Sequence, residues 1–362
     1  MKRLLCIVFS LNAGGAETFL MKIFRSLPAE DYQMDFIVSE AGGCYEQEVL
    51  DRGCLIHGIP RRTDDPCGAL LSIKRIIRKY NYQHVLKLGD KPVSSLDLIA
   101  ARIGGAKCLA MRSCNALTGL SWRSRIINAF LRPIMNVVAN VKIAPSMLAA
   151  EFTFGKRCAH RDVHILHNGV DLKVFHYDTE DRKKIRQEFS LDGKLVVGHI
   201  GRFHKQKNHR FLLEVFSQIR ALREDAVLLL VGVGDLENEI RDQVRSLGLE
   251  GSVIFTGLRF DIPQLLSAMD VFVFPSFHEG MPNTVIEAQA TGLPCVIADT
   301  ITPEADITGL VQYLSLDLSP EVWAQRALSA VTPERADTTQ AFLDHGYDID
   351  SVAKELLRLL GC

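Results

Sequence analysis

The sequence has no run of about 18 apolar residues, so no segment of it is expected to span a membrane as a helix. Its nine cysteines are an odd number, are scattered, and include no Cys-x-x-Cys pair. This usage argues against a disulfide framework and predicts reduced core thiols in a cytosolic protein. The glycine fingerprint of dinucleotide-binding loops, G-x-G-x-x-G, is also missing after the first apolar stretch.

The bulk composition is that of a soluble globular protein, with 362 residues, 47% of them hydrophobic and 23% charged. This length predicts two domains rather than one core. The net charge of −1 hides an asymmetry along the chain. Residues 1–170 hold 23 Lys and Arg against 14 Asp and Glu, and the remaining residues hold 19 against 29. A basic first half and an acidic second half suggest two surfaces with different partners.

Residues 271–299 predict a strand, a loop, a helix and a second strand. The apolar run of the first strand ends at Pro275, because proline cannot keep donating hydrogen bonds to a ladder. A Pro-Asn pair then opens the helix, a position that suits proline. Two carboxylates, Glu279 in the loop and Glu287 about one turn into the helix, stand eight residues apart across this corner.

The start of that helix is a candidate anion site, since free N–H groups and the helix dipole favour a phosphate there. Carboxylates on either side would accept hydrogen bonds from hydroxyl groups. The pattern therefore suggests a polyhydroxylated ligand that carries phosphate, such as a nucleotide-sugar. The alternative interpretation is a surface helix with ordinary acidic residues, because glutamate is common in first turns.

Strand and helix patterns alternate through the first half, which predicts a parallel sheet with helices on both faces. Ligands of such sheets bind beyond the carboxyl ends of the strands. Three segments follow predicted strands and are expected at that edge, namely Gly14-Gly15, Lys87 to Lys91 and Arg112 to Asn115.

A second candidate anion site follows the predicted strand 194–200. Gly201 and Arg202 come directly after this strand, and Lys207 precedes the next helix. A guanidinium fork and an ammonium group at a strand-to-helix turn can both hold a diphosphate. The alternative is a merely solvated basic loop. The later pair Gly232-Val-Gly234 lacks the third glycine of a dinucleotide fingerprint, which argues against a dehydrogenase.

Residues 120–142 contain an amphipathic basic segment, whose part 120–132 carries a tryptophan and several arginines. Such a helix can lie on an anionic membrane surface. The alternative is a helix that packs on the core and exposes its arginines to solvent. The positive balance of the first half keeps the membrane interpretation open.

Several of these motifs together resemble the retaining GT-B glycosyltransferases, most closely their family 4. The motifs are the Glu279-x7-Glu287 corner with Gly280, the loop Gly14-Gly15-Ala16-Glu17, the pair Arg202 and Lys207, and the segment Asn168-Gly-Val-Asp171. The resemblance implies an α/β fold of two Rossmann-like, doubly wound domains that face each other across a cleft. We expect an acceptor-binding domain at 1–171, a nucleotide-sugar-binding domain at 172–345, and a C-terminal helix at 346–362 that crosses back to the first domain.

The resemblance also implies roles for individual residues. The expected catalytic residues are Arg202, Lys207 and Glu279. The expected donor-binding residues are Gly15, Gly201, Arg202, Lys207, Glu279, Gly280, Met281, Pro282, Asn283, Thr284 and Glu287. The acceptor side is expected to include Lys87, Asp90, Arg112 and Asn115, where many family members carry a histidine that this chain lacks.

No cofactor and no essential metal are expected. The lone D-x-D motif, Asp348-Ile-Asp350, precedes a predicted helix, so capping by Asp350 or Ser351 is the favoured interpretation over a metal site.

The resemblance implies a hexosyltransferase that moves a sugar from a nucleotide-sugar, with UDP first and GDP second, to a saccharide or lipid-linked saccharide in surface polysaccharide synthesis. Front-face attack without a covalent intermediate is the implied mechanism. One alternative is an epimerase or hydrolase of a nucleotide-sugar, for which His278 is the local acid or base. Another is a subunit that binds a nucleotide-sugar without catalysis. We expect a cytoplasmic protein with peripheral contact to an anionic membrane and no nucleic-acid partner.

Overall fold

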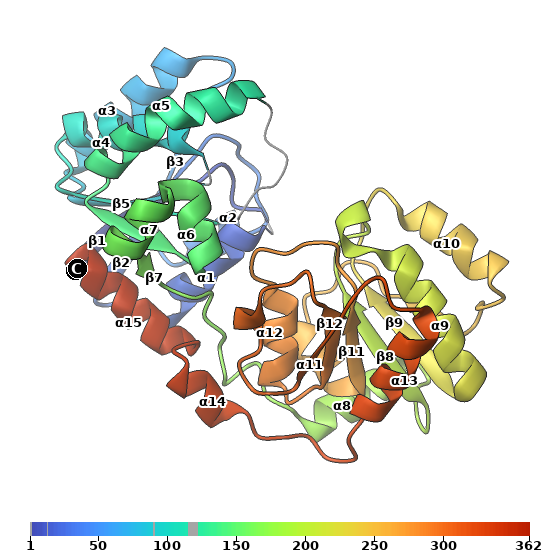
Figure 1. Cartoon of the computed structure of the whole chain (residues 1–362). Coiled ribbons are helices and arrows are strands. Elements are labelled where there is room, and N and C mark those ends of the chain that lie inside the picture. Colours follow the sequence, from blue (N-terminus) through green and yellow to red (C-terminus); the bar gives the residue numbers. More distant parts are fainter. Residues whose placement is uncertain (1, 13, 90, 115–121) are drawn as a thin grey trace. The chain divides into compact units, whose positions relative to one another are not determined.

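The computed structural model describes residues 2–12, 14–89, 91–114 and 122–362, with side chains from residue 129 onward in the last range. The chain divides into two compact units, the first formed by residues 1–169 and 346–362 and the second by residues 170–345 (Figure 1). No helix in the described ranges is both long enough and apolar enough to cross a bilayer.

The first unit is built, within the described residues, on a seven-stranded sheet in the order β3-β2-β1-β4-β5-β6-β7, and every pair in it is parallel. The strands are β1 (Lys2–Ile7), β2 (Tyr32–Val38), β3 (Ile56–Gly58), β4 (His84–Leu88), β5 (Cys108–Arg112), β6 (Val141–Ala144) and β7 (His164–Ile165). The helices are α1 (Gly15–Ser26), α2 (Glu46–Asp51), α3 (Pro66–Tyr80), η1 (Pro92–Ser94), α4 (Ser95–Gly104), α5 (Trp122–Val138), α6 (Met147–Phe154), α7 (Lys156–Asp162) and α15 (Ile349–Leu360).

Helices cover both faces of this sheet, because successive strand residues point to opposite sides. Leu4 and Cys6 of β1 pack in the core formed with α1 and α15, whereas Leu5 and Ile7 pack in the core formed with α3 and α4. Figure 1 shows α3, α4 and α5 on one side of the sheet and α1 and α15 on the other. The alternating parallel architecture predicted for the first half is therefore present.

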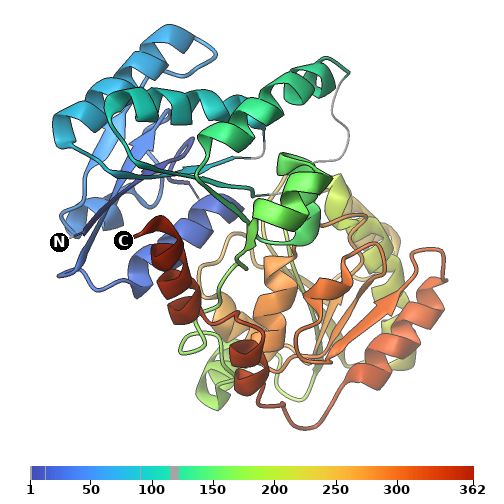
Figure 2. The ribbon, with the colours of Figure 1, turned by 60° about the vertical axis from the view of Figure 1, so that its left-hand side comes forward.

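Helix α15 is the last element of the chain and packs on the first unit, against α1. Figure 2 shows it, in dark red, beside the blue N-terminal elements. Its buried residues recur at helical spacing on one face, Ile349, Val352, Ala353, Leu356, Leu357 and Leu360. The carboxylate of Asp348 accepts a hydrogen bond from the Ser351 N–H at 3.0 Å, so Asp348 rather than Asp350 or Ser351 caps this helix.

The second unit holds a six-stranded sheet within the described residues, in the order β10-β9-β8-β11-β12-β13 and parallel throughout. The strands are β8 (Leu195–Ile200), β9 (Ala226–Val231), β10 (Val253–Phe255), β11 (Val271–Phe274), β12 (Cys295–Ala298) and β13 (Val311–Leu314). The helices are α8 (Thr179–Glu188), η2 (Lys205–Lys207), α9 (His209–Leu222), α10 (Glu237–Ser246), α11 (Ile262–Ala268), α12 (Asn283–Ala290), η3 (Pro303–Ala305), α13 (Pro320–Ala330) and α14 (Thr339–Asp344).

The second sheet is also covered on both faces. Val197 and Leu228 pack with α9 and α13, and Val196 and Leu229 pack with α8, α11 and α12. Strands with two buried faces have no polar side to alternate with, which explains the unbroken apolar runs in this half. One such run, residues 271–274, was expected to form the strand before the Glu279 loop, and it matches β11.

Element ends differ from the prediction by a few residues where loops begin. The apolar run at residues 4–9 predicts a strand that includes Phe9, but the first strand ends at Ile7, and Phe9 is 58% exposed. The Phe9 carbonyl instead accepts hydrogen bonds from the N–H groups of Ser39 and Glu40, which joins the ends of β1 and β2. Pro282 was expected inside the helix and stands at its N-cap.

Candidate active site

The loop after β8 and the loop after β11 meet through an ion pair. The Lys207 Nζ atom lies 2.8 Å from Glu279 Oε1, and the two side chains are 18% and 10% exposed. The Gln206 side chain donates to the His278 carbonyl at 2.8 Å, and the Phe277 N–H donates to the Gln206 carbonyl at 2.9 Å. These bonds hold residues 72 positions apart in the sequence at the carboxyl ends of neighbouring strands.

Lys207 is further positioned by the groups beneath it. Its Nζ atom lies 4.4 Å from the ring centroid of Phe274, a favourable cation–π contact. A Cβ at Gly201 would come within 3.2 Å of the Lys207 stem, so the glycine leaves room for that stem. The ammonium group is therefore fixed by a carboxylate, an aromatic ring and a glycine before any ligand arrives.

The glycines at 232 and 234, which half resemble a dinucleotide loop, serve backbone packing. Gly232 has φ +139°, and a Cβ there would lie 2.3 Å from the Gly201 carbonyl oxygen. A Cβ at Gly234 would lie 2.5 Å from the Phe203 carbonyl oxygen. Only glycine permits this approach of the loop after β9 to the loop after β8.

Two buried imidazoles lie behind Lys207. The rings of His199 and His209 are 4.7 Å apart in an edge-on arrangement. Burial, together with the nearby charge of Lys207, lowers the pKa of His209 to about 4. Burial also lowers the pKa of His199 well below its ordinary value. Both rings are therefore neutral near pH 7, and no imidazolium charge competes with Lys207 for an anion.

Arg202 and Glu287 complete the set of charged residues expected in this unit. Arg202 is exposed, and within the described residues its guanidinium makes no hydrogen bond or ion pair. Glu287 lies in the second turn of α12 and is only 8% exposed. Pro282, at the N-cap of α12, makes no side-chain cap hydrogen bond, and a helix start is a place that favours an anion.

The expected donor-binding residues 279–284 are contiguous with this helix start. Gly280, Met281, Asn283 and Thr284 are half-buried, and Pro282 is buried. Together with Arg202 and Lys207 they combine two cations, a helix N-terminus and two carboxylates in one unit. Such a set can hold a diphosphate and accept hydrogen bonds from sugar hydroxyls.

The residues expected on the acceptor side lie in the first unit, as does Gly15, which opens α1. Lys87 lies on β4, where its Nζ is 3.2 Å from Asp97 Oδ2. Asp90 and Asn115 lie outside the described residues.

Arg112 is buried within the first unit. Its residue is 1% exposed, its guanidinium donates to Asn168 Oδ1 at 2.6 Å, and it lies 3.6 Å from the ring centroid of Phe19. A side chain with these contacts holds β5 to α1 and to the segment after β7. These contacts give Arg112 a structural role, and its role on the acceptor side stays a prediction.

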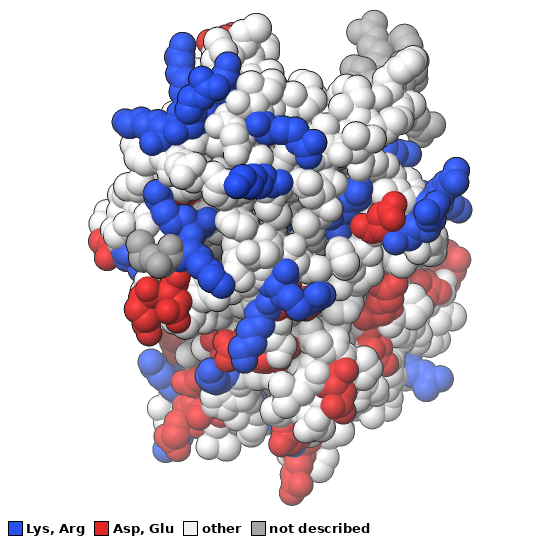
Figure 3. Space-filling view, turned by 90° about the vertical axis from the view of Figure 1, so that its left-hand side faces the viewer, with Lys and Arg blue, Asp and Glu red and all other residues white. Residues whose placement is uncertain are grey.

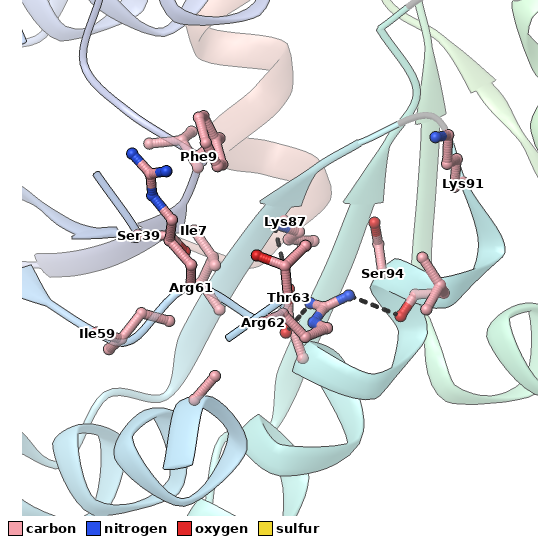
Figure 4. A pocket seen from close by; sticks show the side chains of 14 residues that line it. Ile7, Phe9, Ser39, Ile59, Arg61, Arg62, Thr63, Lys87, Lys91 and Ser94 are labelled. Carbon is pink, nitrogen blue, oxygen red and sulfur yellow. Dashed lines mark hydrogen bonds and ion pairs between the residues drawn. The ribbon is translucent and has the colours of Figure 1, made fainter. Parts of the chain in front are cut away.

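Sequence reasoning missed Arg61 and Arg62, which line a cavity of about 470 Å³ together with Lys87 and Lys91. Figure 4 shows this cavity from close by. Their position after β3 could have predicted this, because ligands bind beyond the carboxyl ends of parallel strands. However, β3 has only three residues, and its end was not among the segments expected at the ligand-binding edge.

Groups of metal ligands are absent from the described part of the chain, where no three His, Cys, Asp or Glu side chains are placed to hold an ion. The D-x-D motif lies at the start of α15, and its Asp348 is engaged in the helix cap. The positive charge of the candidate site comes from Arg202, Lys207 and the helix start.

Comparison with known proteins identifies the family. Residues 194–332 match the family described as glycosyl transferases group 1, and residues 13–174 match glycosyltransferase family 4. EpsF of Bacillus subtilis, which is named as a glycosyltransferase, is 32% identical over 99% of this chain and 96% of its own length. A galactosyltransferase of Escherichia coli, named for transfer from UDP-Gal to alpha-D-GlcNAc-diphosphoundecaprenol, is 27% identical over 79% of this chain and 76% of its own length.

Solved structures agree on the fold. Anabaena HepE, determined in complex with UDP, has a TM-score of 0.80 and 21% identity to this chain, and the match covers 100% of both chains. The match confirms the predicted GT-B architecture of two parallel-sheet α/β domains. From its sequence and its fold, the chain belongs to the group 1 glycosyltransferases of family 4.

Proposed function

We propose that this protein is a retaining hexosyltransferase that uses a nucleotide-sugar, UDP-sugar before GDP-sugar, and acts in the synthesis of a surface polysaccharide. The observation that carries the proposal is the Lys207–Glu279 pair, held beside the uncapped start of α12 with Arg202 in the same unit. The names of the Escherichia coli relative and of the HepE complex, which both include UDP, support that nucleotide. The acceptor is a saccharide or a lipid-linked saccharide, as the name of that relative suggests.

Charge development during the reaction explains the proposed roles. Negative charge grows on the departing diphosphate, and Arg202 with Lys207 stabilises it, since fixed cations are most effective where charge develops. The N–H groups at the start of α12 contact a phosphate. Glu279 accepts hydrogen bonds from sugar hydroxyls, and Glu287 accepts them from the ribose. With its charge provided by side chains and a helix, the site has no need of an essential metal.

The state of Glu279 favours front-face attack over a covalent intermediate. Its carboxylate is held 2.8 Å from an ammonium group, which lowers its nucleophilicity. The acceptor hydroxyl then attacks on the face from which the diphosphate leaves. The epimerase or hydrolase alternative rests on His278, whose backbone carbonyl is bound by Gln206 and whose side chain is exposed.

The test is calorimetric titration of the purified protein with UDP-, GDP- and ADP-sugars, with and without EDTA, followed by turnover with an acceptor. We expect UDP-sugar binding that survives EDTA. Lys207→Ala should lower turnover at least about 100-fold, the usual loss when one charge-stabilising group is removed. Lys205→Ala, in the same turn and exposed, is the charge-matched control and should leave turnover unchanged.

Two results would contradict the proposal. Absence of binding to every nucleotide-sugar would remove the donor site, and full turnover by Lys207→Ala would remove its catalytic role. Binding without turnover on any acceptor would favour the non-catalytic alternative, and loss of activity confined to His278→Ala would favour the epimerase or hydrolase.

We also propose peripheral contact of a cytoplasmic enzyme with an anionic membrane, through α5. Its residues Phe130, Ile134 and Val137 share one helical face and are 75%, 43% and 79% exposed. Residues 98–150 contain seven Lys or Arg and no Asp or Glu. Figure 3 shows Lys and Arg gathered in the upper part of one face and Asp and Glu more frequent lower down. An apolar stripe within a basic stretch suits an anionic bilayer surface. The tryptophan and arginines at 122–126 lie outside the described side chains.

A further inference from the structure

The cavity of the first unit gathers four cations from three segments. Arg61 and Arg62 follow β3, Lys87 is the second-last residue of β4, and Lys91 precedes η1. Figure 4 shows Arg61 and Lys91 on opposite sides of the cavity, with Arg62 and Lys87 between them. The cavity lies at the carboxyl ends of β1, β3 and β4, the edge at which parallel sheets bind ligands.

Among the described residues that line this cavity, Lys and Arg outnumber Asp and Glu. Asp97, with 4% of its side chain exposed, pairs with both Arg62 and Lys87, so one carboxylate serves two cations. Arg61 pairs with Glu40 at 2.6 Å, where both side chains remain more than a third exposed. Lys91 is exposed and makes no ion pair within the described residues. In the ion pairs of the described residues, three of the four cations therefore share two carboxylates, and Asp97 with its two partners is largely removed from solvent.

Neutral donors lie beside the cations. The hydroxyl-bearing residues Ser39, Thr63 and Ser94 line the same cavity. Ser94 ends η1, which runs directly into α4, and its N–H donates to the Lys91 carbonyl at 2.9 Å. Hydroxyl groups and cations together recognise phosphate oxygens.

A purely structural role accounts for only part of this arrangement. The contacts of Arg62 with Asp97 and with the Val93 carbonyl hold the loop after β3 to α4 and η1. That role needs neither Lys91 nor a second cation on Asp97, and it does not need an open cavity of about 470 Å³. A cavity of this size is within the range of small-molecule sites.

We propose that this cavity binds the phosphate or diphosphate group of the acceptor. This proposal rests on the proposed transferase function and specifies the chemistry of its acceptor. Arg61 and Lys91 contact the outer oxygens, and Arg62 with Lys87 forms the floor. Helix α5, with its exposed apolar stripe, packs against η1, which carries part of the cavity wall. A diphosphate that joins a saccharide to a membrane lipid lies at the bilayer surface, so a site beside α5 can reach it.

The first experiment measures anion binding with the donor site already filled. Inorganic pyrophosphate is titrated into the full-length protein in saturating UDP, so that binding at Arg202 and Lys207 does not contribute. The test variant is Arg61→Ala/Lys91→Ala, both exposed residues whose removal leaves the Asp97 network intact. The matched control is Arg78→Ala/Lys107→Ala, which removes two exposed charges of the first unit near the opposite, amino-terminal edge of the sheet.

The wild-type protein and the control should bind pyrophosphate alike, and the test variant should bind it at least about tenfold more weakly, since each lost charge-assisted hydrogen bond contributes on the order of a tenfold change. Equal binding by the test variant and the control would overturn the proposed site. UDP affinity, measured in the same samples, should be the same in all three proteins. If the wild-type protein does not bind UDP, the proposed function fails instead.

The second experiment identifies the source of the anion. Turnover is compared for a saccharide linked to a lipid diphosphate and for the same saccharide as a neutral alkyl glycoside. The test variant should lower the ratio of the two kcat/KM values at least about tenfold, mainly through KM of the diphosphate-linked acceptor. An unchanged ratio, together with weakened pyrophosphate binding, would show that the cavity serves a free anion and would overturn the acceptor assignment.

Discussion

Replacing Glu279 by glutamine should separate donor binding from turnover. In the structure its carboxylate pairs with Lys207 at 2.8 Å, and both side chains are mostly buried. Glutamine keeps the size of the side chain and one acceptor oxygen but loses the charge. Lys207 is then freer to contact a diphosphate, while the sugar hydroxyls lose a charged acceptor.

The size of the effect follows from the geometry. Two unit charges at this separation attract by about 6 kcal/mol with an effective dielectric constant of about 20. Desolvation of both groups offsets most of that attraction, which leaves a net coupling of about 1 kcal/mol. UDP should therefore bind Glu279→Gln as tightly as wild type or up to about tenfold more tightly. Turnover should fall about 100-fold, the loss expected for a hydrogen bond to a charged group that is made in the transition state.

Calorimetry with UDP and a turnover assay with a UDP-sugar measure the two quantities on the same preparation. Lys207→Ala is the companion variant, and it should lose both UDP affinity and turnover. The reasoning fails if Glu279→Gln retains wild-type turnover. It also fails if this variant loses UDP affinity as severely as Lys207→Ala does, because the pair would then act as a single structural unit.

Two further predictions concern pH and membranes. Burial lowers the pKa of His209 to about 4 from an ordinary value of about 6.5, so the folded state resists protonation while the unfolded chain accepts it. The stability contributed by neutral His209 is complete above pH 6.5 and is lost as pH falls toward 4. Between pH 7 and pH 4.5, the free energy of unfolding measured with urea should therefore fall by about 2 kcal/mol less in His209→Phe than in wild type. An equal fall in the two proteins would refute this. The double variant Phe130→Ser/Val137→Ser should co-sediment with anionic vesicles at least about tenfold less than Leu148→Ser, a control that changes an exposed apolar residue of α6. Equal co-sedimentation of the two variants would contradict a membrane contact through α5.

The element pattern was predictable because it depends on local chemistry. Apolar runs such as 271–274 have two buried faces, and proline and glycine mark where such runs stop. Local chemistry also explains the start of α6, where the Ser146 hydroxyl accepts the Ala149 N–H at 3.3 Å. Differences at element ends, as with Phe9 and Pro282, arise because the last residues of an element are set by loop hydrogen bonds between distant segments.

The chemistry of the donor side was also readable, since each of its parts is a short motif at the end of a strand. Glu279, Glu287, Arg202 and Lys207 could be chosen from motif spacing and family resemblance. Their spacing along the chain, however, carries no information about which two side chains touch. The direct contact of Lys207 with Glu279 arises because β8 and β11 are neighbours in the sheet although they are far apart in the sequence.

The two-part α/β fold and the charged residues at the strand ends could be predicted from residue patterns. How those charges are used depends on which segments meet in space. The tertiary structure buried Arg112 against Phe19, and it brought Arg62 and Lys87 to a single shared carboxylate, Asp97. Burial and charge sharing are properties of segments brought together in space, and a linear pattern of residue types records neither of them.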